Sequence, residues 1–170
     1  MTDLLGAVTP IPCLSLWEPW ASLIVAGVKR HETRHWATRL RGRVATHAAK
    51  RVEVDVDPEL DRLCRFALGE GWRSTQTVGC VVAVADLTAC HRTEDLGRET
   101  PAQAYSDWIA GNFEPGRFAF ALDQVRPLID PLPIKGRQGF FHWRPPADLE
   151  ARLGPVVDHW AAARRFGAAG

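Results

Sequence analysis

The sequence lacks the features that mark several large classes of protein. Its four cysteines, Cys13, Cys64, Cys80 and Cys90, are scattered without a C-x-x-C pair, so neither a zinc knuckle nor a redox couple is indicated. No apolar run approaches the ~20 residues needed to cross a bilayer, and the N-terminal stretch, with an early acid and no basic start, does not resemble a secretory signal. We therefore expect a cytoplasmic protein with reduced thiols, no membrane association, no metal and no cofactor.

A large excess of charge is also missing, because the 170 residues carry a formal net charge of only +1. Cations nevertheless concentrate between Lys29 and Arg51, where Glu32 is the only acid. Tryptophans and histidines are interleaved with these cations, and this mixture is typical of surfaces that contact phosphates and stack on bases. The alternative interpretation is a solvated basic face over a tryptophan-containing core.

The elements that the sequence predicts are short and mixed. An N-cap at Asp57, a proline at the first helical position and apolar residues at helical spacing predict a helix that ends at Gly69. Runs rich in β-branched residues predict strands over 78–87, 117–122 and 125–134, with an Asp-Gln turn between the last two. A surface helix is expected over 155–166, with Val156 and Trp160 turned inward. The sequence therefore predicts an α+β fold, a small mixed β-barrel of five or six strands with peripheral helices.

A second cationic segment lies near the end of the chain. It reads Lys135-Gly136-Arg137-Gln138-Gly139 and precedes an aromatic strand. Glycines allow a backbone to approach a ligand closely, so this loop is a candidate binding element. The alternative is a hairpin whose glycines supply positive φ angles and whose neighbouring rings fill a core.

Two motifs carry a resemblance to a known family. The string G-x-K-x-x-E-x-R-x-W runs from Gly27 to Trp36, and K-G-x-x-G begins at Lys135. With these motifs, residues 13–144 resemble the ASCH (activating-signal-cointegrator homology) domains of the PUA-like superfamily, in particular the version found in transcriptional coactivators. The resemblance implies a PUA-like barrel with a cleft beside it. The domain would span 13–145, between an N-terminal extension (1–12) and a C-terminal helical extension (146–170).

The resemblance also implies a ligand and a site. ASCH domains are regarded as nucleic-acid binders, so we expect RNA or DNA, single-stranded or locally opened, or a nucleoside-like ligand. The residues expected to bind it are Trp17, Trp20, Lys29, Glu32, Arg34, Trp36, Arg41, Lys50, Lys135 and Gln138. Cations would anchor phosphate oxygens, tryptophan faces would stack on bases, and Glu32 would accept hydrogen bonds from a base edge or fix an arginine. The alternative is structural, with the tryptophans in the core and Glu32 paired with Arg34 or Arg41.

Two other functions stay open at this point. Small enzymatic relatives that deacetylate acetylated cytidine resemble this segment through a lysine that activates a threonine three positions later, but Glu32 occupies that position here. Lys29 and Glu32 would be the catalytic pair of a ribonuclease or nucleoside amidohydrolase if burial moved both pKa values towards neutrality. The third possibility is a protein-interaction module that binds through its tryptophan-rich face.

Overall fold

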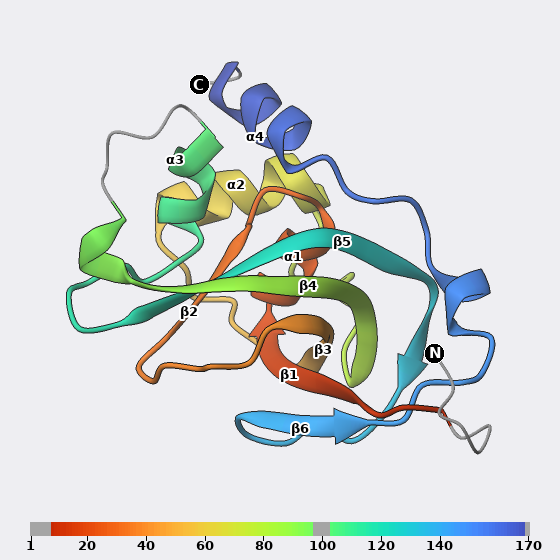
Figure 1. The fold of residues 1–170 in the computed structure, drawn as a ribbon. Coiled ribbons are helices and arrows are strands. Elements are labelled where there is room, and N and C mark those ends of the chain that lie inside the picture. The colour runs from red at the N-terminus through yellow and green to blue at the C-terminus, as the bar shows by residue number, and fades with distance from the viewer. Residues whose placement is uncertain (1–7, 97–102, 169–170) are drawn as a thin grey trace.

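The computed structural model describes residues 8–96 and 103–168, which form a six-stranded sheet with helices packed against it (Figure 1). The strands are β1 (Ile11–Glu18), β2 (His31–Arg34), β3 (Gly42–Val52), β4 (Cys80–Arg92), β5 (Phe118–Pro133) and β6 (Phe140–Trp143). The helices are α1 (Trp20–Val25), α2 (Pro58–Leu68), α3 (Gln103–Ile109) and α4 (His159–Ala168), with 3-10 turns at Thr93–Asp95 and Leu149–Arg152. The predicted mixed α+β class is confirmed.

The order of the strands leaves the sheet open. It runs β2-β5-β4-β3-β1-β6, and every neighbouring pair is antiparallel except β1 and β3, which are parallel. In the described part of the chain β2 and β6 are edges and do not pair with each other, so the predicted closed barrel is not confirmed. Rings bridge the two edges instead, because Trp36, just after β2, lies edge-on against Phe140 of β6 with ring centroids 5.6 Å apart.

Strand β5 corrects one prediction. Residues 118–133 form one strand, not two strands separated by a turn at Asp123-Gln124. Gln124 has a φ angle of 50°, and the register between β4 and β5 shifts between Val84 and Asp86. The chain therefore accommodates these residues as a bulge, which bends a strand without ending it.

Helices cover one side of the sheet, where α2, α3 and α4 lie together above it in Figure 1. The predicted helix after Asp57 is confirmed, because the Asp57 carboxylate accepts hydrogen bonds from the backbone N–H groups of Glu59 and Leu60. Its buried face, which includes Leu63, packs with Leu23 of α1 in a shared core. No helix in the described ranges is both long enough and apolar enough to span a membrane.

The C-terminal segment is only partly as predicted. Helix α4 begins at His159, and residues 155–158 are not helical. Val156 is 47% exposed, so the prediction that it turns inward is wrong. Val157 ties this segment to β5, since its N–H donates to the Val125 carbonyl at 2.8 Å. The side chain of Trp160 lies outside what the structure describes.

Candidate nucleic-acid interface

A cleft of about 1270 Å³ lies where the two edges of the sheet approach each other. Its floor comes from the adjacent strands β1 and β3, and its walls come from the end of β2 with the residues that follow, and from the segment that precedes β6. The lining residues are Ser15, Trp17, Arg34, His35, Trp36, His47, Ala49, Lys50, Gly79 and the whole segment 133–139. The cleft thus joins segments that are more than one hundred residues apart in the sequence.

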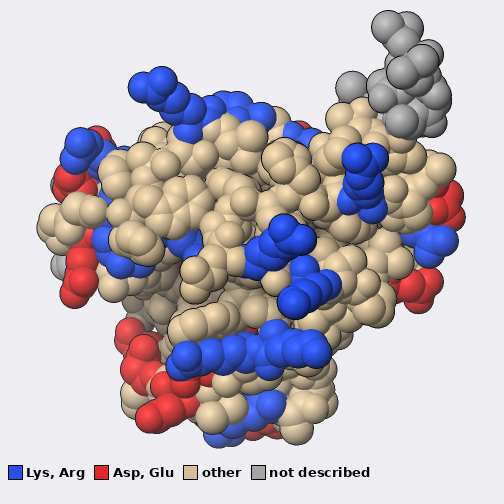
Figure 2. Space-filling view, turned by 90° about the horizontal axis from the view of Figure 1, so that it is seen from below, with Lys and Arg blue, Asp and Glu red and all other residues tan. Residues whose placement is uncertain are grey.

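The charge of this cleft is of one sign. Arg34, Lys50, Lys135 and Arg137 line it, and among the described lining residues there is no Asp or Glu. Figure 2 shows Lys and Arg side chains gathered across the middle of the face seen from below Figure 1, with acidic side chains mainly towards its margins. A concave surface lined by one sign of charge attracts ligands of the opposite sign.

The structure brings only some of the predicted site residues into this cleft. Those that line it are Trp17, Arg34, Trp36, Lys50, Lys135 and Gln138. Of the other predicted residues, Lys29, Glu32, Trp20 and Arg41 are not among the lining residues in the described part of the chain. Trp20 packs partly buried between the sheet core and the helices, and exposed Arg41 donates to the carbonyls of Thr38 and Leu40.

Lys29 is fully buried behind the wall of the cleft. Its Nζ donates to the carbonyl oxygen of His31 at 2.6 Å and to that of Ala110, just after α3, at 2.9 Å. It also lies 3.5 Å from Oε2 of Glu32. A buried ammonium group requires such partners, and here they tie the start of β2 to the end of α3.

Glu32 connects Lys29 with the cleft. Its other carboxylate oxygen lies 2.9 Å from Nε of Arg34, an ion pair in which that N–H group does not have hydrogen-bond geometry. The Arg34 guanidinium also donates to the Ser15 carbonyl of β1 at 2.9 Å. Lys29 and Glu32 therefore hold Arg34 in the wall, and Arg34 is the charged member of the signature that lines the cleft.

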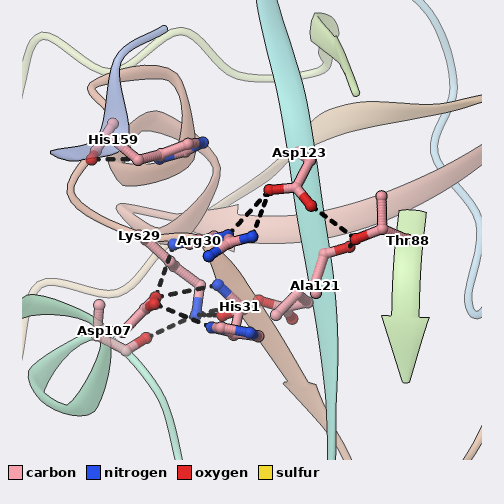
Figure 3. A network of polar contacts seen from close by, with 11 residues as sticks. Lys29, Arg30, His31, Thr88, Asp107, Ala121, Asp123 and His159 are labelled. Atoms are coloured by element: carbon pink, nitrogen blue, oxygen red, sulfur yellow. Dashed lines mark hydrogen bonds and ion pairs between the residues drawn. The ribbon is translucent and has the colours of Figure 1, made fainter. Parts of the chain in front are cut away.

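A network on α3 and β5 fixes the start of β2 from both sides (Figure 3). Asp107 of α3 accepts from the backbone N–H groups of Arg30 and His31, and its second oxygen lies 3.0 Å from Nδ1 of His31. Burial favours the neutral carboxyl, but the hydrogen bonds and charge of His31 keep the pKa of Asp107 below its usual value. On the other side, the Arg30 guanidinium binds Asp123 of β5 at 2.6 and 3.0 Å.

The loop from Lys135 to Gln138 is held from below by a pair that sequence reasoning missed. Ser15 and His47 are register partners on the parallel strands β1 and β3, with Oγ and Nδ1 3.0 Å apart. Nε2 of His47 lies 3.3 Å from the Ile134 carbonyl, so we assign the proton to Nε2 and let Nδ1 accept from the serine hydroxyl. Burial lowers the pKa of His47, although the bond to Ile134 opposes this shift. His47 is therefore a neutral link between the floor and the loop.

Gly136 lets the loop lie directly on this pair. A Cβ atom at Gly136 would stand 2.4 Å from Cε1 of His47 and 2.7 Å from Oγ of Ser15, closer than real contacts allow. A signal for Ser15 alone was present in the sequence, because residues two apart on a strand share a face. Ser15 and Trp17 alternate with the buried Leu14 and Leu16, but the parallel register that adds His47 has no local sequence signal.

The described residues contain no group of three or more His, Cys, Asp or Glu side chains that could hold a metal ion. The groups that the cleft offers a ligand are cations, indole rings, an amide and the backbone of a glycine-containing loop. This set suits an anion that also carries aromatic rings.

Comparison with known proteins gives three findings. The model of the ASCH domain matches residues 14–120. Activating signal cointegrator 1 of Homo sapiens is 32% identical over 127 residues, which are 73% of this chain and 21% of the human protein, and the Mus musculus protein is 31% identical over 128 residues. The chain thus spans about a fifth of the length of these relatives. Crystal structures of ASCH from Zymomonas mobilis and of a mutant of it superpose with TM-scores of 0.49 and 0.48 at 19% and 20% identity. They cover 86% and 84% of this chain and 97% and 98% of their own.

Proposed function

The chain belongs to the ASCH domain family, and we propose that it binds single-stranded RNA or DNA in the cationic cleft between β2 and β6. The observation that carries this proposal is the lining of the cleft, whose described residues include Arg34, Lys50, Lys135 and Arg137 but no Asp or Glu. Glu32, which pairs with Arg34, is not among those lining residues. Cations placed along one groove are what a phosphate backbone requires. Trp17 and Trp36 line the same groove and offer ring surface to bases.

The size of the cleft favours a strand over a nucleoside. Small-molecule sites are typically about 300–1,000 Å³, whereas this open cleft measures about 1270 Å³. The four cations come from three segments, β2, β3 and the loop that precedes β6, so a ligand that contacts all of them must extend across the cleft. A stretch of several nucleotides meets that condition.

The geometry gives less support to a hydrolase that uses Lys29 and Glu32. A general base must reach the proton that it removes. Lys29 is fully buried, and its Nζ donates to two carbonyls and lies beside Glu32. Both residues are better suited to hold Arg34 than to contact a substrate, and we propose that role for them.

The test is the salt dependence of binding. Labelled single-stranded RNA, single-stranded DNA and a duplex of the same sequence are titrated with the protein, with fluorescence anisotropy as the readout, at several salt concentrations. If four phosphates are contacted, log K should fall with log[salt] with a slope of about −3 for a single strand. Lys135→Ala should reduce the steepness of this slope by ~0.7.

Arg164→Ala is the matched control, because Arg164 is an exposed cation on α4, outside the cleft. It should leave the slope unchanged. If neither RNA nor DNA binds, or if Lys135→Ala and Arg164→Ala have equal effects, the proposal is wrong. Binding of a protein partner through the tryptophan-bearing face would then be the hypothesis to pursue.

A further inference from the structure

We propose that Trp17, backed by Arg51, is a platform on which one unpaired base stacks. This inference rests on the proposed function. It adds a contact with a base to the contacts with phosphates. It makes the ligand an unpaired nucleotide segment, whose bases are free to leave their own stack, and not a duplex.

The exposure of Trp17 is the first observation. Its side chain is 46% exposed, whereas Trp72 is fully buried and Trp143 is 6% exposed. Large rings are usually mostly buried, because their burial contributes strongly to stability. The core does not require this ring, since its strand neighbours Leu16 and Glu18 are buried on the other face of β1.

The second observation is how the ring is held. The Arg51 guanidinium carbon lies 3.7 Å from the centre of the Trp17 ring, and the same guanidinium binds Glu53 at 3.0 Å. A cation over a ring face is attracted by the electrons of the ring, so Arg51, itself held by Glu53, supports one orientation of the indole. A fixed ring loses little conformational freedom when a ligand binds.

The third observation is on which side Arg51 lies. Trp17 and Lys50 line the cleft, but Arg51 is not among its described lining residues. We infer that Arg51 covers the face of the indole turned away from the cleft, which leaves the opposite face for a ligand. One free face accepts one base.

The neighbourhood of Trp17 fits a nucleotide. Lys50 precedes Arg51 in β3 and lines the cleft, and its aliphatic stem packs over Gly79, where a Cβ atom would lie 3.4 Å from its Cε. A base on Trp17 therefore has a cation near it for the phosphate on the same nucleotide. A ring face and a cation do not distinguish one base from another, so we expect stacking with little sequence preference.

An abasic oligonucleotide separates bases from phosphates. The wild-type protein is titrated with a ten-residue oligothymidylate and with a ten-residue abasic strand of the same charge, and the ratio of the two affinities is compared with that of variants. One stacked base should make this ratio about 5 to 150 in the wild-type protein. Trp17→Ala should lower the ratio about fivefold or more, and Trp17→Phe should keep most of it.

Two further variants complete the test. Arg51→Ala should lower the ratio as well, because the ring loses its support, while the loss of one positive charge affects both strands and cancels in the ratio. Tyr105→Ala is the matched control, since Tyr105 is 43% exposed but lies on α3, outside the cleft, and it should keep the wild-type ratio.

The outcomes separate this inference from the function on which it rests. Equal, salt-dependent binding of both strands by the wild-type protein would overturn the platform and leave the cationic cleft intact. A ratio that Trp17→Ala does not change would overturn it too, because another group would then carry the base. If neither strand binds, both proposals fail.

Discussion

Replacement of Lys29 by methionine should strongly destabilise the protein, although a lysine in a basic signature is easily interpreted as a ligand-binding residue. Methionine has a similar length and is apolar, so the substitution leaves the packing nearly filled. It removes the donor to the carbonyls of His31 and Ala110 and the cation beside Glu32. Two buried carbonyls and a carboxylate then lose a partner.

The structure sets the size of the effect. Breaking a buried ion pair by removal of one partner costs about 3–5 kcal/mol. The Arg34 guanidinium remains beside Glu32, and this places the expected loss at the lower end, about 3 kcal/mol. With a urea m-value of about 2 kcal/mol/M, the midpoint of unfolding should fall by about 1.5 M. Proteins of this size are typically stable by ~5–15 kcal/mol, so the variant should still fold.

Urea denaturation, monitored by circular dichroism, measures this loss of unfolding free energy. Lys135→Met is the control, because Lys135 is exposed. The control should change stability by less than about 0.5 kcal/mol. In binding the order should reverse, because Lys29 does not line the cleft and Arg34 keeps its contacts with Glu32 and Ser15. Folded Lys29→Met should therefore change the salt slope less than Lys135→Met does. A Lys29→Met midpoint equal to that of the wild-type protein would refute the structural role that we assign to Lys29.

Three further predictions concern the core and the loop. Gly136→Ala should lose about 1–3 kcal/mol of stability and weaken nucleic-acid binding, measured by denaturation and anisotropy, because its Cβ would collide with His47; unchanged values for both would contradict this. Burial raises the pKa of Glu18 from its usual value of 4.5 to about 7, against hydrogen bonds from Ser22. The ionised carboxylate therefore opposes folding. As pH rises from 4.5 to above 7, the free energy of unfolding of the wild-type protein should fall by up to ~3 kcal/mol relative to that of Glu18→Gln. Urea midpoints of the two proteins that stay parallel across this range would contradict this prediction. Burial also raises the pKa values of the Cys13 and Cys64 thiols to about 12, so iodoacetamide should modify them only after unfolding, as mass spectrometry would show.

Local signals predicted the elements whose ends the chain itself encodes. Helix α2 was predictable because Asp57 caps it and Gly69 ends it, both within the segment. The continuity of β5 was not predictable in this way. An Asp-Gln pair between two apolar runs normally indicates a turn, but Asp123 is held by Arg30, a residue far away in the sequence, and the strand passes through the bulge.

The candidate site shows the same division. The signature motifs drew attention to three residues that line the cleft, Arg34, Trp36 and Lys135. Pattern alone did not reveal that Lys29 is buried, since its partner Ala110 is 81 residues distant. The link from Ser15 through His47 to Ile134 was equally hidden, because it depends on the parallel register of β1 and β3.

The contact between Gly136 and His47 affects how much conformational entropy the loop loses when a ligand binds. A surface loop that carries two cations would ordinarily sample many shapes, and a ligand would have to freeze it at a cost of about 0.5–1.5 kcal/mol for each long side chain ordered and more for the backbone. Here the backbone rests on an imidazole that is already anchored at both nitrogens. The backbone that carries Lys135 and Arg137 is thus preformed before any ligand arrives, so a ligand has to order only the two side chains and not the loop itself.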